Sequence, residues 1–468
     1  MSEADPIPEL EAEPETQLDR DDRLKPEFVR AVLDAVEAGD AEAARILVDP
    51  LHPADIADLF ELTPGDERPA LARALAELLD ADVFAEMNDY VREGLIDALE
   101  PHEVADIASE LDTDDAVAII EDMEEDDQKA VLRALDPDDR AAIEEALSYP
   151  EESAGRLMQR ELIAVPEHWT VGDAIDYLRG HEELTTDFWE IFVVDPAHKP
   201  VGTCQLSWIL RTPRTVAMSD VMKREHTLIP VDMDQEEVAL RFQKYALISA
   251  AVIDGTGRLV GMITVDDIVH IISEEAGEDI LRLSGAGEGD INEPIALTVR
   301  TRITWLVVNL GTAMVAASVV GFFQGEIARF ALLAVLMPIV SGMGGNAGTQ
   351  TLAVVVRALA TNQLTDSNTM RMIGREFRIA TANGVMLGLL VGAGTFLIFQ
   401  NRDLSIVIAL AMLTNNLIAG LAGVLVPVTL DRARIDPAVS SAVFVTMATD
   451  VMGFFSFLGL AALWGLSA

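Results

Sequence analysis

The chain has 468 residues, of which 79 are acidic and 33 are basic, so its formal net charge is −46. This excess of negative charge argues against nucleic acid as a partner, because duplex binding depends on Lys and Arg side chains that neutralise phosphates. The single cysteine, Cys204, excludes an internal disulfide, and the first residues lack the basic and apolar regions of a secretory signal.

The charge divides the chain at residue 300. Residues 1–300 contain 72 acidic and 24 basic side chains, whereas the remainder contains seven and nine. This contrast predicts a soluble acidic part, which we expect in the cytosol, followed by an apolar part in the lipid bilayer. Acidic clusters favour cations as ligands, although well-solvated acidic helices or a salt-adapted source produce the same composition.

The soluble part begins with a helical region. Residues 1–24 are expected to form a disordered acidic tail, and residues 25–150 have the pattern of short helices separated by turn residues. The helical region is weakly repetitive, because segment 55–59 resembles segment 103–107. Such repetition predicts a helical superhelix. Its acidic turns, such as residues 121–127, are most simply explained as solvated faces.

Residues 151–273 contain a duplication. Residues 157–158 match residues 221–222 at an offset of 64, and apolar strand-like runs alternate with helical patterns in both copies. The two copies are assigned to residues 151–218 and 219–273. They predict a tandem of two small α/β modules.

Gly261, Thr264 and Asp267 resemble the second module of a CBS domain pair, in which the Thr and the Asp contact a nucleotide. This resemblance implies that Thr264 and Asp267 bind an adenine nucleotide such as ATP. The first copy has Gln205 and Trp208 at the positions that match Thr264 and Asp267, and it therefore departs from the pattern.

Residues 274–299 are expected to form a connecting helix and a linker that lead to the first membrane span. The helical pattern begins at Asp266, where Ile and Val alternate with acidic residues, and it predicts an amphipathic helix lying under the membrane. The glycine-rich segment 285–290 follows this pattern and is interpreted as a flexible linker.

Residues 300–468 are expected to form an all-α transmembrane domain. They contain five apolar stretches long enough to cross a bilayer core, which needs about 20 helical residues. The stretches are residues 303–323, 328–356, 379–399, 404–430 and 437–466. Eight arginines flank them on one side and two on the other. This bias predicts a cell-membrane protein with cytosolic N-terminal domains and its C-terminus outside.

The second stretch contains Pro338 and a run of glycines that ends before Gln350, so we expect a broken helix that frees backbone carbonyls. Irregular backbone is tolerated at membrane depth where it lines a cavity. Close helix packing through small residues is the alternative. Asn346 in this segment, and Asn415 and Asn416 in the fourth stretch, carry amides that are costly to expose to lipid but that can join helices.

Asp450 lies about halfway along the fifth stretch and is the only acidic residue inside the five apolar stretches. A carboxylate at the bilayer centre costs several kcal/mol unless it faces a wet cavity or a cation, which makes an ion pathway the default interpretation. A neutral carboxyl held by interhelical hydrogen bonds is the alternative. Thr446, Asp450 and Gly453 share one helical stripe, which suits the wall of a pore.

The order of these parts resembles the MgtE family of magnesium channels over nearly the whole chain. Segments 149–158, 344–350 and 436–453 carry the most specific similarity. The resemblance implies a homodimer with a pore at the dimer interface and Mg²⁺ influx that is gated by cytosolic Mg²⁺. It also implies that Asp450 is the pore acid and that Asn346 lines the pore.

Mg²⁺ gives up its water reluctantly and is usually held by one or two carboxylates. One Asp450 from each of two chains would balance its charge while the ion stays hydrated. Backbone carbonyls near Gly344 and Thr446, together with the Asn346 amide, are expected to orient the waters. The match to the family's plug region makes six acidic residues candidates for regulatory Mg²⁺ sites, namely Asp266, Asp267, Glu274, Glu275, Glu278 and Asp279.

Three other functions are compatible with the sequence. They are transport of another divalent cation such as Mn²⁺ or Co²⁺ under CBS control, transport of another solute, and nucleotide sensing by a membrane-anchored protein. Anion transport is disfavoured because the last three apolar stretches contain no basic residue. No combination of nucleophile, base and metal ligands typical of an enzyme is present in the sequence.

Overall fold

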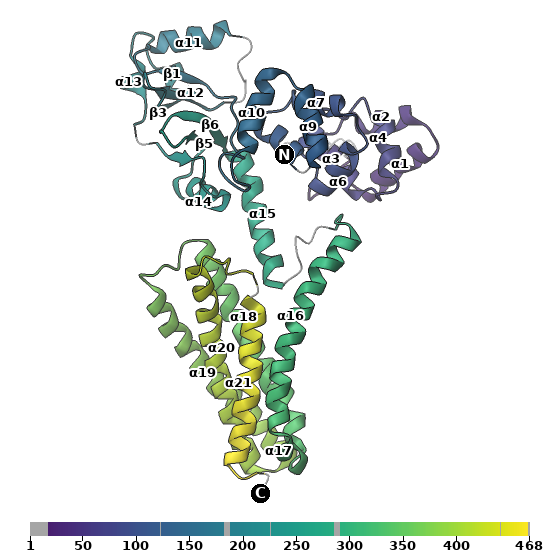
Figure 1. The fold of residues 1–468 in the computed structure, drawn as a ribbon, viewed down its shortest axis with the longest axis vertical. Helices are drawn as coiled ribbons and strands as arrows, with labels where there is room; N and C mark the ends of the chain where they lie inside the picture. Colours follow the sequence, from purple (N-terminus) through teal and green to yellow (C-terminus); the bar gives the residue numbers. More distant parts are fainter. Residues whose placement is uncertain are drawn as a thin grey trace, which may run out of the picture. The chain divides into compact units, whose positions relative to one another are not determined.

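The computed structural model describes residues 17–121, 123–181, 188–224, 226–284, 291–439 and 441–466. It divides into two compact units, Met1–Ile272 and Ser273–Ala468, which are described separately (Figure 1). Most of the predicted acidic tail and the whole of the predicted glycine-rich linker, residues 285–290, lie outside the described residues.

The first unit begins with short helices. They are α1 (Pro26–Glu37), α2 (Ala41–Val48), α3 (Pro53–Leu62), α4 (Arg68–Ala74), α5 (Ala81–Ala85), α6 (Asp89–Ile96), α7 (Pro101–Ala108), α8 (Thr113–Glu121), α9 (Glu125–Ala134) and α10 (Pro137–Leu147). Proline in the first turn favours several of these helices, because its fixed φ suits a helix start and its missing N–H is not needed there. The Asp40 and Asp80 carboxylates cap α2 and α5 by accepting hydrogen bonds from backbone N–H groups.

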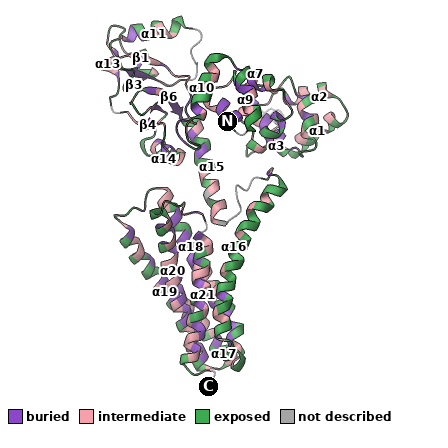
Figure 2. Cartoon of the chain, viewed as in Figure 1, coloured by how far each residue is buried: buried purple, intermediate pink, exposed green. Residues whose placement is uncertain are grey.

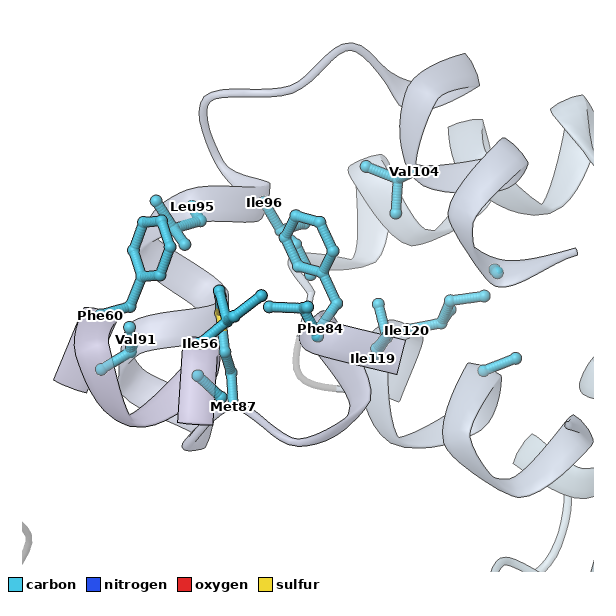
Figure 3. Packing of buried hydrophobic residues seen from close by; sticks show 14 of the residues in the cluster. Ile56, Phe60, Phe84, Met87, Val91, Leu95, Ile96, Val104, Ile119 and Ile120 are labelled. Carbon is cyan, nitrogen blue, oxygen red and sulfur yellow. The ribbon is translucent and has the colours of Figure 1, made fainter. Parts of the chain in front are cut away.

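One hydrophobic core joins these short helices. Phe60 from α3, Phe84 from α5 and Ile120 from α8 lie among its buried side chains (Figure 3). Burial of each such side chain contributes about 1.5–3 kcal/mol, which matters because helices this short are unstable in isolation. The predicted helical N-terminal domain is confirmed.

The duplicated region forms two three-stranded sheets. Its elements are β1 (Ala164–Pro166), α11 (Val171–Gly180), β2 (Glu190–Val194), β3 (Pro200–Gln205), α12 (Leu206–Arg211), α13 (Met218–Val221), β4 (Leu228–Pro230), α14 (Gln235–Tyr245), β5 (Ser249–Ile253) and β6 (Leu259–Thr264). In each sheet the first pair of strands is parallel and the second is antiparallel. The register shifts at matching places, after Val193 in one sheet and after Val252 in the other. The predicted pair of α/β modules is confirmed.

Two glycines show that each α/β module packs against the opening segment of the other module. A Cβ atom at Gly261 in β6 would lie 2.7 Å from the Met158 sulfur, and one at Gly202 in β3 would lie 2.8 Å from the Met222 sulfur. The segment that opens each module therefore packs against the last strand of the other module. Only glycine leaves room for this exchange, because any larger residue would collide with the methionine.

Helix α15 (Val265–Ser284) follows β6 directly and runs for 20 residues. Its first turns belong to the second α/β module, since Ile268 and Ile271 are buried in that module's core. The sequence boundary drawn after residue 273 therefore falls inside one helix, because the apolar stripe that fills the module's core continues into the connecting segment.

The second unit contains α16 (Ile295–Phe322), α17 (Gln324–Arg329), α18 (Leu332–Ala360), α19 (Thr369–Phe399), α20 (Arg402–Arg432) and α21 (Ser441–Leu463). Among the described residues, all of these except the short α17 are long and apolar enough to cross a membrane, which gives five candidate spans. Helix α20 packs against α18, α19 and α21. It is also the most enclosed of the five. In its 18-residue apolar stretch 56% is buried, compared with 6% in the corresponding stretch of α16 (Figure 2).

Helix α18 corrects the prediction of a broken helix. It runs without interruption through Pro338 and the glycines. The glycines are used for packing instead: a Cβ at Gly344 would lie 2.0 Å from the Asn415 amide nitrogen, and one at Gly348 would lie 2.6 Å from a Val445 methyl group. Close approach of helices through small residues therefore accounts for this segment.

Helix α19 is longer than the apolar stretch that predicted it. It begins at Thr369, before the apolar stretch that starts at residue 379, and so it includes Glu376. The Glu376 side chain is buried between the helices of the second unit. Asp450 remains the only acidic residue inside the five apolar stretches. The candidate membrane helices extend beyond those stretches, and α19 thereby adds the buried Glu376.

Candidate cation sites

Asp450 lies in the middle of α21 and is half-buried. The Ser341 hydroxyl of α18 donates a hydrogen bond to Asp450 Oδ1. This hydrogen bond ties the predicted pore acid to the neighbouring helix α18. Ser341 was missed in the sequence, where its position next to the glycine run was the only available signal.

The other predicted pore residues lie in two different environments. Asn346 on α18 and Thr446 on α21 are exposed on the surface of the single chain. Gly344 and Gly453, in contrast, are buried on either side of Asn415, which occupies the space that a side chain at either glycine would fill. The stripe of Thr446, Asp450 and Gly453 therefore reaches from an exposed surface into the interior of the bundle.

Asn415 joins α20 to α18. Its Nδ2 donates a hydrogen bond to the Val340 carbonyl at 2.8 Å, and its side chain is fully buried. Its Oδ1 has no hydrogen-bond partner among the described residues. In the structure Asn415 therefore joins two helices, which is one of the roles that the sequence allowed for it.

The first unit contains an acidic cluster that only partly matches the prediction. Asp114 and Asp115 at the start of α8 lie close to Asp267 in the first turn of α15, and Asp112 precedes them. Burial, followed by repulsion from Asp267, raises the pKa of Asp114 well above its usual range and that of Asp115 to about 6. Burial also raises the pKa of Asp267. Carboxylates held this close favour either protonation or a bound cation.

The predicted nucleotide residues contact each other. The Thr264 hydroxyl donates a hydrogen bond of 2.8 Å to Asp267 Oδ2, and this contact partly offsets the effect of burial on the Asp267 pKa. The same carboxylate therefore belongs both to the Thr264 pair and to the acidic cluster. Asp114 and Asp115 were missed because acidic residues in a first helical turn are common for reasons of helix stability alone.

The remaining regulatory candidates on α15 are spread along the helix. Asp266 and Glu274 are exposed, whereas Glu278 forms an ion pair with Arg282. Arg282 also pairs with Asp436 at 2.8 Å. Glu275 is half-buried, and the side chain of Asp279 lies outside the described part of the structure. The structure thus brings Glu278 and Asp436 together around Arg282 and does not gather the six candidates into one site.

Within the described residues, no group of three His, Cys, Asp or Glu side chains is placed to hold a metal ion. A cation at Asp450 or at the Asp267 cluster would therefore keep part of its water shell or take a further ligand from a second chain. Retained water is normal for Mg²⁺.

These features define a class of protein. An apolar bundle with five candidate spans carries a carboxylate in mid-helix, and an acidic helical domain with paired α/β modules precedes it. This combination is typical of a membrane transporter for cations with a regulatory domain.

Three family models match the chain. The divalent cation transporter domain of MgtE matches residues 337–460, the MgtE intracellular N domain matches residues 51–152, and the CBS domain matches residues 218–274. The chain belongs to the MgtE family. The CBS match covers the second module, whose residues carried the resemblance in the sequence.

Curated relatives agree over nearly the full length. The magnesium transporter MgtE of Thermus thermophilus is 30% identical over 451 residues, which span 92% of this chain and 97% of the relative. The magnesium transporter MgtE of Bacillus subtilis is 28% identical over 439 residues, which span 93% and 97%. A solved structure of the cytosolic domain of the Mg²⁺ channel MgtE in complex with ATP covers 52% of this chain and 99% of its own, with 28% identity and a TM-score of 0.47.

Proposed function

We propose that the protein carries Mg²⁺ across the cell membrane through a pathway lined by Asp450 and that cytosolic Mg²⁺ regulates it. The observation that carries this proposal is the half-buried Asp450 carboxylate, which a hydroxyl from α18 holds in the middle of α21. The full-length relatives are magnesium transporters, which supports Mg²⁺ as the substrate.

The active form is a homodimer in this proposal. Asn346 and Thr446 are exposed on the same helices that carry Ser341 and Asp450, and polar groups facing lipid are costly. A partner chain removes that cost and brings a second Asp450 to the ion. Two carboxylates neutralise one Mg²⁺, which keeps several of its waters and gives up only part of its hydration shell. Gly344, which is buried, contributes at most its backbone carbonyl.

Regulation resides in the acidic cluster of Asp114, Asp115 and Asp267. Their mutual repulsion disfavours close contact between α8 and the start of α15 when the cytosol lacks Mg²⁺. A bound Mg²⁺ neutralises the cluster and holds these helices together. Asp266, Glu274, Glu275, Glu278 and Asp279 remain secondary candidates, and α15 is the element that transmits the change.

Two finer features complete the proposal. The N-terminal domains lie in the cytosol and the C-terminus lies outside, as the flanking arginines favour. ATP binds the second CBS module beside Thr264 and Asp267. It would there compete with a Mg²⁺ bound at the acidic cluster for the Asp267 carboxylate.

Flux measurements on the purified protein in liposomes test the pathway. The Asp450→Asn variant should lower Mg²⁺ flux at least about tenfold, because the ion loses the charge that offsets its dehydration. Asp366→Asn is the matched control, since Asp366 is exposed and pairs with Arg432 outside the bundle. Undiminished flux through Asp450→Asn would refute the assignment. Parallel runs with Mn²⁺ and Co²⁺ measure selectivity.

A further inference from the structure

A polar pocket lies in the membrane unit, between α18, α19 and α20. It offers about 200 Å³ to water, which is room for several molecules. Six of its lining residues carry polar groups, namely Gln350, Thr351, Arg375, Glu376, Asn383 and Asn416. Neither Asp450 nor Ser341 belongs to the lining, so this pocket is separate from the pathway described above.

Glu376 is the first reason to regard the pocket as a binding site. Its side chain is 6% exposed, and its one hydrogen bond among the described residues comes from the Thr351 hydroxyl at 3.2 Å. A buried carboxylate with a single neutral donor is costly. A cation beside it would remove that cost, and a proton on the carboxyl is the alternative.

Asn416 is the second and independent reason. It is 1% exposed, and its Nδ2 donates a hydrogen bond of 2.9 Å to the Met412 carbonyl of its own helix. This bond fixes which end of the amide is oxygen, because a carbonyl can only accept. Asn416 Oδ1 is then left without a partner among the described residues, which costs about 1–3 kcal/mol for a buried acceptor.

Packing around the pocket is tight, so the space is not a loose gap. A Cβ at Gly384 of α19 would lie 2.9 Å from a Leu413 methyl group, and one at Gly420 of α20 would lie 2.8 Å from the Ala380 side chain. These glycines hold α19 against α20 directly beside Glu376 and Asn416. The two oxygen ligands therefore come from helices whose separation is fixed.

We propose that this pocket binds a hydrated divalent cation in each protomer, with Glu376 and Asn416 Oδ1 as its protein ligands. The buried groups supply oxygen acceptors, which hard divalent cations prefer, and the volume leaves room for the retained waters. Arg375 also lines the pocket but is exposed. The positive charge of Arg375 weakens the binding of a cation, but its exposed side chain leaves Glu376 and Asn416 Oδ1 available as ligands.

Equilibrium dialysis with Mn²⁺ on the full-length protein in detergent tests this site. Glu376→Gln keeps the size and the acceptor for Thr351, and it should bind one Mn²⁺ fewer per protomer than the wild-type protein. The matched control Asp366→Asn should lose none. Equal Mn²⁺ counts for Glu376→Gln and wild type would overturn the proposal, as would loss of bound phospholipid with no loss of Mn²⁺.

A second variant covers the case in which Glu376→Gln fails to fold, as judged by its unfolding midpoint. Asn416→Asp adds a carboxylate to the same pocket and should tighten Mn²⁺ binding about tenfold, because ligand charge tunes cation affinity. Unchanged affinity would refute the site. The assay counts ions without transport, so its failure is distinguishable from a failure of the Asp450 pathway, which flux measures.

Discussion

Acidic side chains are abundant in the first unit and rare in the membrane helices, and the structure treats them differently. In the first unit most carboxylates are exposed, and those of Asp114, Asp115 and Asp267 stand out because they are crowded and partly buried. In the membrane unit Asp450 and Glu376 each receive one hydroxyl, from Ser341 and Thr351, both on α18. Crowding marks the candidate site in the first unit, and a hydrogen bond from a hydroxyl of α18 marks each of the two carboxylates in the membrane unit.

The hydroxyl in the membrane unit gives the largest expected effect. Ser341→Ala removes the donor and should lower Mg²⁺ flux about tenfold, because a hydrogen bond to a charged group is worth about 1.5–3 kcal/mol. Ser318→Ala is the control, since the one hydrogen bond that the Ser318 hydroxyl donates among the described residues goes to the Val315 carbonyl of its own helix. Full flux through Ser341→Ala would show that the hydroxyl does not mark the site.

The crowded acids of the first unit predict a dependence on pH. Their raised pKa values mean that the folded state binds protons that the unfolded state releases, so stability around α8 and α15 should rise as pH falls through about 6. Without Mg²⁺, amide hydrogen exchange in α8 should slow about threefold between pH 7 and pH 5, after correction for intrinsic exchange rates.

A double variant tests whether crowding is the cause. Asp114→Asn with Asp115→Asn should abolish this pH effect and also the protection that added Mg²⁺ gives. Asp126→Asn with Asp127→Asn, which changes two exposed acids in the first turn of α9, should preserve both. A pH effect that survives the first double variant would contradict the assignment.

Arg282 gives the smallest effect. Its ion pairs with Glu278 and Asp436 are about one-third exposed, and such pairs contribute about 0.2–1 kcal/mol. Arg282→Gln should speed amide exchange at the end of α15 about twofold. Arg432→Gln, which breaks the more exposed pair with Asp366, should leave α15 unchanged. A tenfold change would place Arg282 among the main elements that hold this helix.

The sequence predicted the parts of the molecule that depend on local pattern. Five long apolar stretches, the repeat around Met158 and Met222, and the isolated charge of Asp450 are visible without a structure. What it could not supply depends on pairs of distant residues. Asp114 becomes unusual only beside Asp267, and Ser341 only beside Asp450.

One wrong prediction and one missed residue have the same origin. The glycine run of α18 was expected to break the helix, because propensity was judged without Asn415, which fills the space above Gly344. Glu376 was overlooked because its helix starts in polar sequence and because its donor, Thr351, lies on another helix. In each case tertiary packing decided what local composition left open.

Helix α15 has a mechanical consequence. Because it is continuous from Val265 to Ser284, its length of 20 residues corresponds to about 30 Å. If it moves as a rigid rod, a tilt of about ten degrees at its first turn would displace the far end by about 5 Å. Asp267 lies in its first turn and Arg282 in its last turn, so a cation bound at Asp267 would act on one end of a continuous helix whose other end carries the Arg282 ion pairs.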